Sequence, residues 1–173
     1  MKFRNATISD LDQILSITKD AKEYLKQSGS TQWNEADGYP NKDTFINDIN
    51  NNQLYLLEDN NKILGFEALI VGNEISYNKI DGSWLTNTTS SYLTIHRIAV
   101  SKFARGKHIS SILINEAINL AKSNNLLSVR GDTHKLNIPM QHLFTSSNFQ
   151  YCGIINLINN NYDNERLAYE YII

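Results

Sequence analysis

The sequence predicts a mixed α/β fold in which helices cover both faces of a central sheet. Segments with the β-branched and aromatic composition of strands alternate along the chain with segments whose apolar residues recur at helical spacing. At residues 92–100 a strand leads through a short basic loop directly into an amphipathic helix. No internal repeat or linker interrupts the 173 residues, so we expect one domain spanning residues 1–173.

The chain opens with a short extended segment, residues 2–6, and continues into two helices. Ser9, with Asp12 three residues later, matches a capping box and predicts the start of the first helix. Apolar residues keep helical spacing as far as about residue 27. After an aperiodic loop, Asn41 is a favourable N-cap residue and predicts the start of the second helix.

Strands dominate the middle of the chain. Residues 53–57 and 62–71 have strand composition and are joined by a polar hairpin turn. Residues 72–91 are polar and rich in turn formers, so we expect a loop-like insertion whose apolar side chains fold back on the body or line a cleft. Strand 92–100 then leads through the basic loop 101–107 into the next helix.

The last third of the chain continues the alternation of strands and helices. The composition and spacing of apolar residues predict a strand at residues 126–131, a helix at 138–146 and a strand at 149–157. Alternating apolar residues at 167–173 predict the closing strand. The predicted order is therefore strand, two helices, three strands, helix, strand, helix and two strands.

Composition and charge exclude several classes of function. The hydrophobic content of 41% and the charged content of 20% are those of an ordinary globular protein. A formal net charge of −2 leaves no broad basic field for nucleic acid, and no apolar run approaches the roughly 20 residues of a membrane span. With Cys152 as its one cysteine, the chain has no disulfide framework. We expect a cytoplasmic protein without nucleic-acid or membrane partners; a homodimer is left open.

The junction between strand 92–100 and the following helix predicts a phosphate site. Arg105 and Lys107 place positive charge directly before the helix. The first N–H groups of a helix have no partner within it, and the helix dipole adds partial positive charge there. Ser110 and Ser111 add hydroxyl donors in the first turn.

Two runs of residues at this junction carry a family resemblance. They are Ile-His-Arg-Ile-Ala-Val at 95–100 and Arg-Gly-Lys-His-Ile-Ser at 105–110, and they resemble the coenzyme-binding core of the GNAT superfamily of acyl-CoA-dependent N-acetyltransferases. In that family the signature Arg/Gln-x-x-Gly-x-Gly/Ala holds the pyrophosphate of coenzyme A with backbone amides. Arg105 matches its first position, whereas His108 and Ser110 replace its two small residues.

His108 is the larger departure, because glycine at that position allows close approach of the backbone. Its side chain weakens the grip on the coenzyme, donates to a phosphate or simply faces solvent. The predicted order of strands and helices is also that of the GNAT fold, which implies a largely antiparallel central sheet.

A second motif of the family has its counterpart in the C-terminal half. Its pattern, Asn-x-x-Ala-x-x-Leu-Tyr-x-x-x-Gly-Phe, is similar to the run from Asn137 to Phe149, and residues 132–171 resemble a branch of small bacterial GNAT proteins of mostly unassigned substrate. Phe144 stands where the family often has a tyrosine that protonates the departing thiolate. The substitutes for that acid are Thr133, His134, Tyr151, Cys152 or water.

The resemblance implies a reaction and a co-substrate. The expected reaction is direct attack by a primary amine of a small molecule, amino acid or peptide on acetyl-CoA in a ternary complex, without a metal. The rival interpretation is a CoA-sensing or ligand-binding module on the same scaffold that has little or no turnover. The residues implied to bind the coenzyme are Ile98, Ala99, Val100, Arg105, Gly106, Lys107, His108, Ile109, Ser110, Ser111, Asn137 and Phe144.

Three side chains are candidates for catalysis. His96 is the first choice for the general base, since an ordinary pKa of about 6.5 suits proton abstraction near neutral pH. Strand alternation places it on the face of Ile98 and Val100 unless a bulge intervenes; the alternative is a histidine at the edge of the core. His134, just past a strand end, takes part in catalysis or stabilises its loop. Cys152 is either a covalent nucleophile or packing in an apolar strand.

Aromatic and acidic side chains predict the acceptor pocket, opposite the coenzyme. Acids attract a cationic amine, so we expect a small amine, an amino acid or a peptide N-terminus as the acceptor. The aromatic candidates are Trp33, Tyr39, Tyr77 and Trp84, and the acidic candidates are Glu67, Asp132, Asp81 and Glu35.

Overall fold

The computed structural model describes residues 1–34, 38–87, 89–158 and 163–173. Its strands are β1 (Lys2–Asn5), β2 (Leu54–Asp59), β3 (Lys62–Val71), β4 (Ile80–Gly82), β5 (Tyr92–Val100), β6 (Ser128–Thr133), β7 (Gln150–Asn156) and β8 (Glu165–Ile172). Its helices are α1 (Leu11–Gln27), α2 (Lys42–Asn50), α3 (Ile109–Ser123) and α4 (Ile138–Ser146), with the 3-10 turns η1 (Ile8–Asp10), η2 (Ile75–Asn78) and η3 (Lys102–Ala104). No helix among the described residues is long and apolar enough to cross a membrane.

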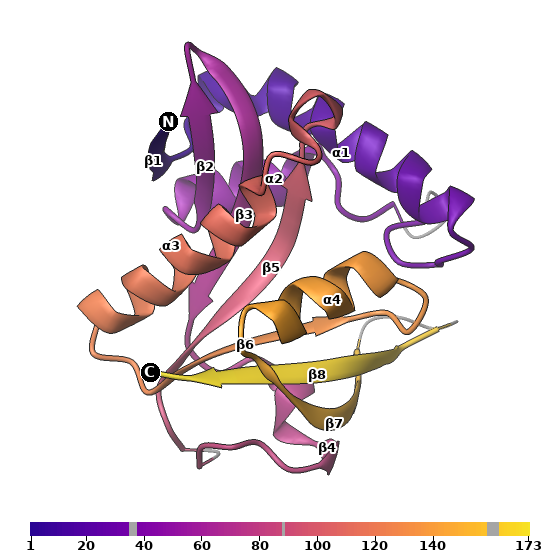
Figure 1. Ribbon diagram of the computed structural model, residues 1–173, viewed down its shortest axis with the longest axis vertical. Helices are drawn as coiled ribbons and strands as arrows, with labels where there is room; N and C mark the ends of the chain where they lie inside the picture. Colours follow the sequence, from indigo (N-terminus) through magenta and orange to yellow (C-terminus); the bar gives the residue numbers. More distant parts are fainter. Residues whose placement is uncertain (35–37, 88, 159–162) are drawn as a thin grey trace. The chain divides into compact units, whose positions relative to one another are not determined.

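The eight strands form one sheet in the order β1-β2-β3-β5-β6-β8-β7-β4 (Figure 1). Strands β5 and β6 pair in parallel, whereas β1–β2, β2–β3, β6–β8, β7–β8 and β4–β7 pair antiparallel. This confirms the predicted mixed, largely antiparallel sheet. Every predicted strand and helix is present with small shifts at its ends, and β4, inside the segment expected to be loop-like, is an addition.

The chain divides into two compact units, which are described separately. The first unit comprises Met1–Leu69 and His96–Glu116, and the second comprises Ile70–Ile95 and Ala117–Ile173.

In the first unit, α1 and α2 cover one face of the strands β1–β3. Phe66 of β3 is fully buried there together with Ile14 of α1 and Phe45 of α2. The rings of Phe45 and Phe66 meet edge to face with centroids 5.5 Å apart, a geometry that aromatic pairs favour. The start of α3 packs on the opposite face of β3, so helices cover both faces here as predicted.

A glycine permits that second packing. A Cβ atom at Gly65 of β3 would lie 2.9 Å from the carbonyl oxygen of Ala99 and 3.1 Å from side-chain carbons of Ile109 and Leu113. Such distances leave no room for a side chain. Gly65 therefore lets α3 seat closely on the sheet, where Ile109 and Leu113 form a buried cluster with Leu57.

The observed capping box lies earlier in the chain than the predicted one, and it uses different residues. The carboxylate of Asp10 accepts the backbone N–H of Thr7 at 2.8 Å, which places the box at Thr7 and Asp10, not at Ser9 and Asp12. Arg4 fixes this choice, because its guanidinium donates to both oxygens of Asp10 at 2.8 and 2.9 Å. The predicted cap of α2 is confirmed, since Asn41 accepts the N–H of Thr44 at 2.9 Å.

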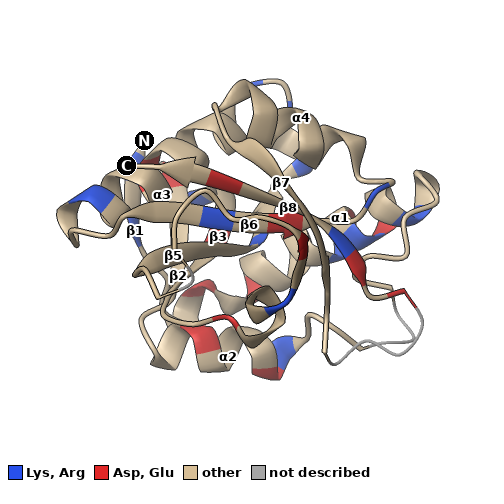
Figure 2. Cartoon of the chain, turned by 90° about the horizontal axis from the view of Figure 1, so that it is seen from below, with Lys and Arg blue, Asp and Glu red and all other residues tan. Residues whose placement is uncertain are grey.

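In the second unit, a buried ion pair ties the insertion to the sheet. Arg130 on β6 donates to Glu170 on β8 at 2.9 Å, and both side chains are almost completely buried. Figure 2 shows basic positions in blue and acidic positions in red along the sheet, including β6 and β8. Glu170 also accepts the backbone N–H of Leu85 at 2.6 Å and the hydroxyl of Thr86 at 2.5 Å. The Arg130 guanidinium lies 4.2 Å from the ring centroid of Trp84. The segment expected to be loop-like is thus anchored by buried polar contacts.

Candidate functional site

The loop between β5 and α3 has the backbone geometry of an anion site. Gly106 has φ 76° and His108 has φ 58°, so two residues of the short loop occupy the left-handed region. The N–H of Ile112 donates to the carbonyl of His108 at 3.1 Å and begins the ladder of α3. The N–H groups of the preceding turn have no carbonyl partner within the helix. The start of α3 therefore offers unpartnered N–H groups directly after the basic loop, an arrangement that favours an anion.

The conformation of His108 explains the glycine that the related signature has at this position. A residue with a Cβ atom adopts the left-handed region at a cost of about 1–2 kcal/mol, whereas glycine adopts it freely. His108 has this conformation, with an exposed side chain. His108 therefore holds a backbone conformation that glycine would adopt without strain.

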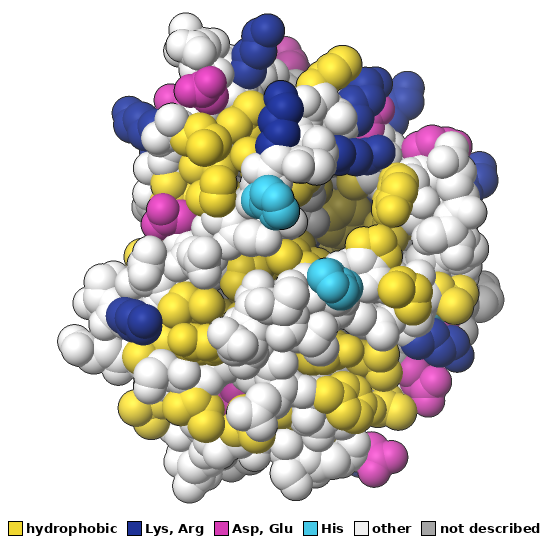
Figure 3. Space-filling model, in the orientation of Figure 1, with side chains coloured by type: hydrophobic (Ala, Val, Ile, Leu, Met, Phe, Trp, Pro, Cys, Tyr) yellow, Lys and Arg dark blue, Asp and Glu magenta, His cyan; other side chains and the backbone are white. Residues whose placement is uncertain are grey.

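Basic side chains surround this loop within the first unit. Arg105 and Lys107 are exposed, and the Arg105 guanidinium lies 4.9 Å from the ring centroid of Tyr24 on α1. Lys102 lies 3.2 Å from Asp20, so its charge is partly compensated. Figure 3 shows Lys and Arg side chains gathered on the upper part of the visible face. Two cations beside free helix N–H groups favour a multiply charged anion.

His96 lies on β5 directly before a break in the strand geometry. Arg97 has φ 51°, and this left-handed residue interrupts the alternation that would place His96 on the face of Ile98 and Val100. Ala99 accordingly packs in the core covered by α1 and α2, whereas Ile98 and Val100 pack in the cluster beneath α3. His96 is half-buried and interacts electrostatically with Asp48 of α2. Burial raises the pKa of Asp48, while the charges of Arg97 and His96 oppose that rise.

His134 is held in a structural network of the second unit. Its side chain is 1% exposed, and its Nε2 lies 2.8 Å from the carboxylate of Asp163. Its Nδ1 accepts the backbone N–H of Leu136 at 3.3 Å, which makes Nε2 the donor to Asp163. With both ring nitrogens engaged, His134 fits the loop-stabilising alternative better than a role as catalytic base.

The environment of Cys152 disfavours a nucleophile. Burial and the carboxylate of Glu170 raise the pKa of its thiol to about 11. A nucleophilic cysteine needs the opposite shift, because the thiolate is the reactive form. Cys152 packs with Tyr77, Trp84 and Tyr92 in the core of the second unit, so packing accounts for it.

Two of the predicted coenzyme ligands have structural roles in the second unit. Asn137 is the N-cap of α4 and accepts the N–H of Met140 at 3.4 Å. Phe144 is fully buried, and a Cβ atom on Gly131 would lie 2.5 Å from its ring. Its ring stacks on Tyr169 with centroids 5.0 Å apart. Phe144 therefore packs α4 against the sheet and has no exposed surface that a ligand could contact.

Several of the predicted acceptor residues are buried within their own unit. Tyr77 and Trp84 are 1% and 9% exposed, with the Tyr77 hydroxyl donating to Asp132 at 2.7 Å and the Trp84 indole donating to the carbonyl of Tyr77 at 3.0 Å. Both side chains belong to the core cluster of the second unit, which agrees with the alternative that the apolar side chains of this segment fold back on the body. Glu67 is completely buried on the face of β3 that α3 covers, so it presents no charge to solvent.

Two predicted acceptor residues of the first unit remain candidates. Trp33 is half-buried against the core beneath α1 and α2. Tyr39 is 40% exposed, and its hydroxyl accepts a hydrogen bond from Arg97 at 2.7 Å. Asp81 is exposed on β4 of the second unit, and Glu35 lies outside the described residues.

The sequence pattern does not indicate the ion pair of Asp48 and Arg97. Arg97 donates to both carboxylate oxygens of Asp48 at 2.8 Å, and the two side chains are only 4–8% exposed. Because 48 residues separate them along the chain, no local pattern links them. An arginine inside an apolar strand was the available signal, since a buried charge needs a partner.

Comparisons with known proteins agree with this geometry. The family model described as "Acetyltransferase (GNAT) family" matches residues 14–149. A GNAT-family acetyltransferase from Streptococcus agalactiae 2603 is 34% identical, with a TM-score of 0.89, and the match covers 99% of this chain and 95% of that one. A proposed acetyltransferase from Staphylococcus aureus Mu50 is 30% identical, with a TM-score of 0.74 and 99% of both chains covered.

A more distant structure has the same fold. Arabidopsis thaliana NAA60, solved in complex with acetyl-CoA, is 16% identical with a TM-score of 0.72, and the match covers 99% of each chain. None of the curated proteins is similar enough to match.

Proposed function

Because this chain belongs to the GNAT family of acetyltransferases, we propose that it transfers an acetyl group from acetyl-CoA to a primary amine. The acceptor is a small molecule, an amino acid or a peptide N-terminus, and the amine attacks directly within a ternary complex. The family establishes acyl-CoA-dependent acetyl transfer; the nature of the acceptor and the order of steps are our proposal.

The observation that carries the proposal is the loop before α3. The loop contains the left-handed residues Gly106 and His108, and the exposed Arg105 and Lys107 add positive charge directly before the N-terminus of the helix. This arrangement suits the pyrophosphate and 3′-phosphate of coenzyme A better than a singly charged ligand. Ile109, Ser110 and Ser111 supply the N–H groups of the first turn.

Acetyl-CoA supplies the acetyl group as a thioester, and the other tasks fall to the chain. Backbone N–H groups of residues 98–100 on β5 stabilise negative charge on the carbonyl oxygen, a contribution worth about 3–4 kcal/mol for one oriented donor. His96 takes the proton that the ammonium group must lose before its lone pair can attack.

The departing thiolate needs no dedicated acid. Phe144 has no proton to give, and its burial keeps it away from any ligand. A thiol of ordinary pKa, about 8.5, leaves as a thiolate near neutral pH without full protonation. Water then completes the step.

The acceptor side is supported by residues of the first unit. Tyr39 is exposed beside Arg97, and it offers a substrate both an aromatic ring and a polar hydroxyl group. Trp33 adds a second half-buried aromatic ring. These features suit a compact amine and do not select among its classes.

The second candidate function is CoA sensing without turnover. Phe144 in place of the family's acid, together with a strained His108 in the signature, favours it. Calorimetry with CoA and thioester cleavage across a panel of amines, amino acids and short peptides separate the two functions. We expect saturable CoA binding and cleavage that depends on one class of amine. CoA binding with no cleavage for any amine would favour sensing, and no CoA binding would contradict both.

A further inference from the structure

The strand that is proposed to hold the acetyl group contains a strained residue. Arg97 lies in the middle of β5 with φ 51°. A residue other than glycine in this region costs of order 1–3 kcal/mol and persists only where its surroundings enforce it. The ladder between β5 and β6 has Ile95 paired with Gly131 as its last pair, so the strain begins directly where that ladder ends.

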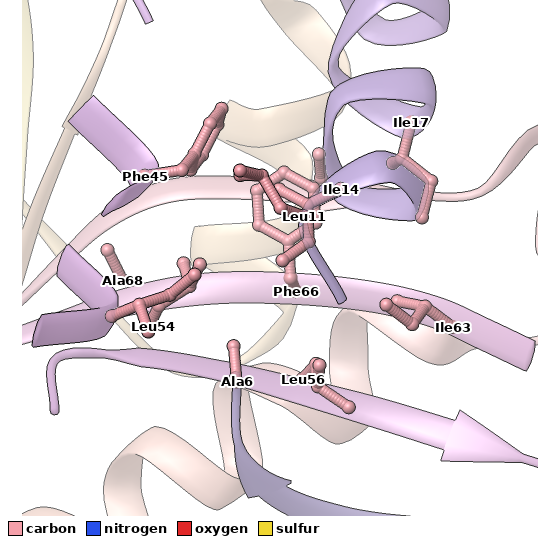
Figure 4. Packing of buried hydrophobic residues seen from close by; sticks show 12 residues of the cluster. Ala6, Leu11, Ile14, Ile17, Phe45, Leu54, Leu56, Ile63, Phe66 and Ala68 are labelled. Atoms are coloured by element: carbon pink, nitrogen blue, oxygen red, sulfur yellow. The ribbon is translucent and has the colours of Figure 1, made fainter. Parts of the chain in front are cut away.

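The surroundings that enforce it are on α2. Asp48 accepts the Nε and Nη2 of Arg97 at 2.8 Å each, and the Nη1 donates to Tyr39 at 2.7 Å. Helix α2 is itself fixed, because Phe45 packs against Phe66 in the core of the first unit (Figure 4). Two of the three hydrogen bonds of the guanidinium therefore go to the fixed helix α2, and the third goes to Tyr39 in the loop before it.

After Arg97 the strand regains a defined alternation. Ala99 is buried in the core that α1 and α2 cover, whereas Ile98 and Val100 pack with the cluster beneath α3. The direction of each following N–H group thus depends on the turn made at Arg97. These are the N–H groups that polarise the carbonyl in the proposed reaction.

We propose that Asp48 is a positioning residue for acetyl transfer. Through its ion pair it holds Arg97 in the left-handed conformation and so fixes the backbone of β5 at residues 97–100. The proposal rests on the proposed function for its kinetic consequence, but its structural part stands by itself.

Stability alone is a poor explanation of this pair. A buried ion pair is often no more stabilising than apolar residues of similar volume, because both charges lose their hydration. The pair sits on the one strained residue of β5, where a geometric role has an immediate use. Recognition of the substrate by Arg97 is also a poorer explanation, since Asp48 and Tyr39 already occupy three of its donors.

Two variants at position 97 isolate the backbone effect. Arg97→Ala and Arg97→Gly both remove the guanidinium, but only glycine adopts φ 51° without strain. We expect Arg97→Gly to retain a kcat roughly 10-fold above that of Arg97→Ala, because misplacement by about 1 Å can cost 10²-fold. Equal losses in the two variants would show that the guanidinium itself acts, and would overturn the proposal.

The role of Asp48 is tested by Asp48→Asn and by the double variant Asp48→Leu/Arg97→Met. We expect kcat to fall roughly 10–100-fold in both, with CoA affinity within a few-fold of wild type. The double variant should keep its Tm near wild type, because it replaces an ion pair by apolar groups. Asp10→Asn is the matched control, since it breaks another arginine–aspartate pair of the same unit; it should lower Tm and leave kcat unchanged. A double variant as active as wild type would overturn the proposal.

Hydrogen exchange separates this proposal from the proposed function. In Asp48→Asn the amides of residues 97–100 should exchange at least several-fold faster, while those of α1 stay unchanged. If the wild type shows no turnover with any amine, the proposed function fails. The exchange data then still test whether Asp48 holds the backbone of residues 97–100. Unchanged exchange at these amides would overturn the proposal that Asp48 fixes this backbone, whatever the activity of the variant.

Discussion

Glu67 on β3 is completely buried and interacts electrostatically with Glu116 on α3, a second acid. Neither carboxylate oxygen of Glu67 has a hydrogen-bond partner among the described residues. A buried charge without a partner is very unfavourable, so the group is neutral in the folded protein. Burial raises the pKa of Glu67 well above its ordinary value, and repulsion by Glu116 raises it further.

The first prediction concerns the stability of the protein at alkaline pH. Because the folded state holds a proton on Glu67 that the unfolded chain releases above pH 4.5, the free energy of unfolding falls as pH rises toward the raised pKa. Glu67→Gln keeps the size of the side chain and cannot ionise. Its Tm should fall less than that of wild type between about pH 5 and pH 9. Parallel Tm profiles would show that Glu67 is already ionised in the folded state.

The second prediction concerns acid, where the sign is opposite. Hydrogen bonds from Arg4 lower the pKa of Asp10 to about 2. Its contribution to stability is present above its ordinary pKa of 3.8 and is lost as pH falls toward 2. Asp10→Asn should therefore lose about 1–2 kcal/mol near neutral pH, and little near pH 2. Urea unfolding at the two pH values measures both terms; an equal loss at both would assign the effect to packing.

Local chemistry made the coenzyme loop and the order of elements predictable. Arg105 and Lys107 directly precede the helix, and Ser110 and Ser111 lie in its first turn, so neighbouring residues along the chain suggested a phosphate site. The capping box was misplaced because Thr7-x-x-Asp10 and Ser9-x-x-Asp12 carry the same pattern. Only Arg4, which reaches Asp10 in the folded chain, distinguishes them.

Residues that depend on distant partners were not predictable in the same way. Tyr77 and Trp84 lie in a polar stretch, and their burial follows from contacts with residues such as Asp132. Glu67 reads as a surface acid on a strand, and only the packing of α3 on that face buries it. The turn at Arg97 on β5 depends on Asp48 of helix α2, and no periodic pattern in the sequence indicates it.

The third prediction tests the strained residue of the signature. His108→Gly and His108→Ala both remove the imidazole, but only glycine relieves the left-handed conformation. We expect His108→Gly to be more stable than His108→Ala by about 1 kcal/mol. If the backbone alone grips the phosphate, CoA affinity in His108→Gly should equal or exceed that of wild type in calorimetry. A loss of affinity shared by both variants would instead identify the imidazole as a phosphate donor.

The fourth prediction concerns the charges at the same loop. Arg105→Ala should lower CoA affinity roughly 10-fold and flatten its dependence on salt, because exposed charges are screened within about 8 Å at physiological ionic strength. Dephospho-CoA should bind wild type less tightly than CoA. Lys62→Ala is the matched control, since Lys62 is an exposed cation at the start of β3. A salt-independent affinity in the wild type would argue against an electrostatic site.

The fifth prediction assigns the general base. An amine arrives at neutral pH mostly as ammonium and must lose a proton before it can attack the thioester. Among the three histidine and cysteine candidates, His134 has both ring nitrogens engaged and Cys152 has a raised pKa. His96 is left, on the strand that bears the proposed carbonyl donors.

His96→Ala should therefore lower kcat by roughly 10²–10⁴-fold and leave CoA affinity near wild type. His96→Gln, which keeps a hydrogen-bonding group but cannot cycle a proton, should be nearly as slow, whereas Cys152→Ser should keep kcat within a few-fold of wild type. Steady-state rates across pH carry the decisive signature, because loss of the base removes the rise of kcat with pH. A His96→Gln variant with wild-type rate and an unchanged profile would transfer the role to water, and the enzyme would then collect amines that are already neutral in solution.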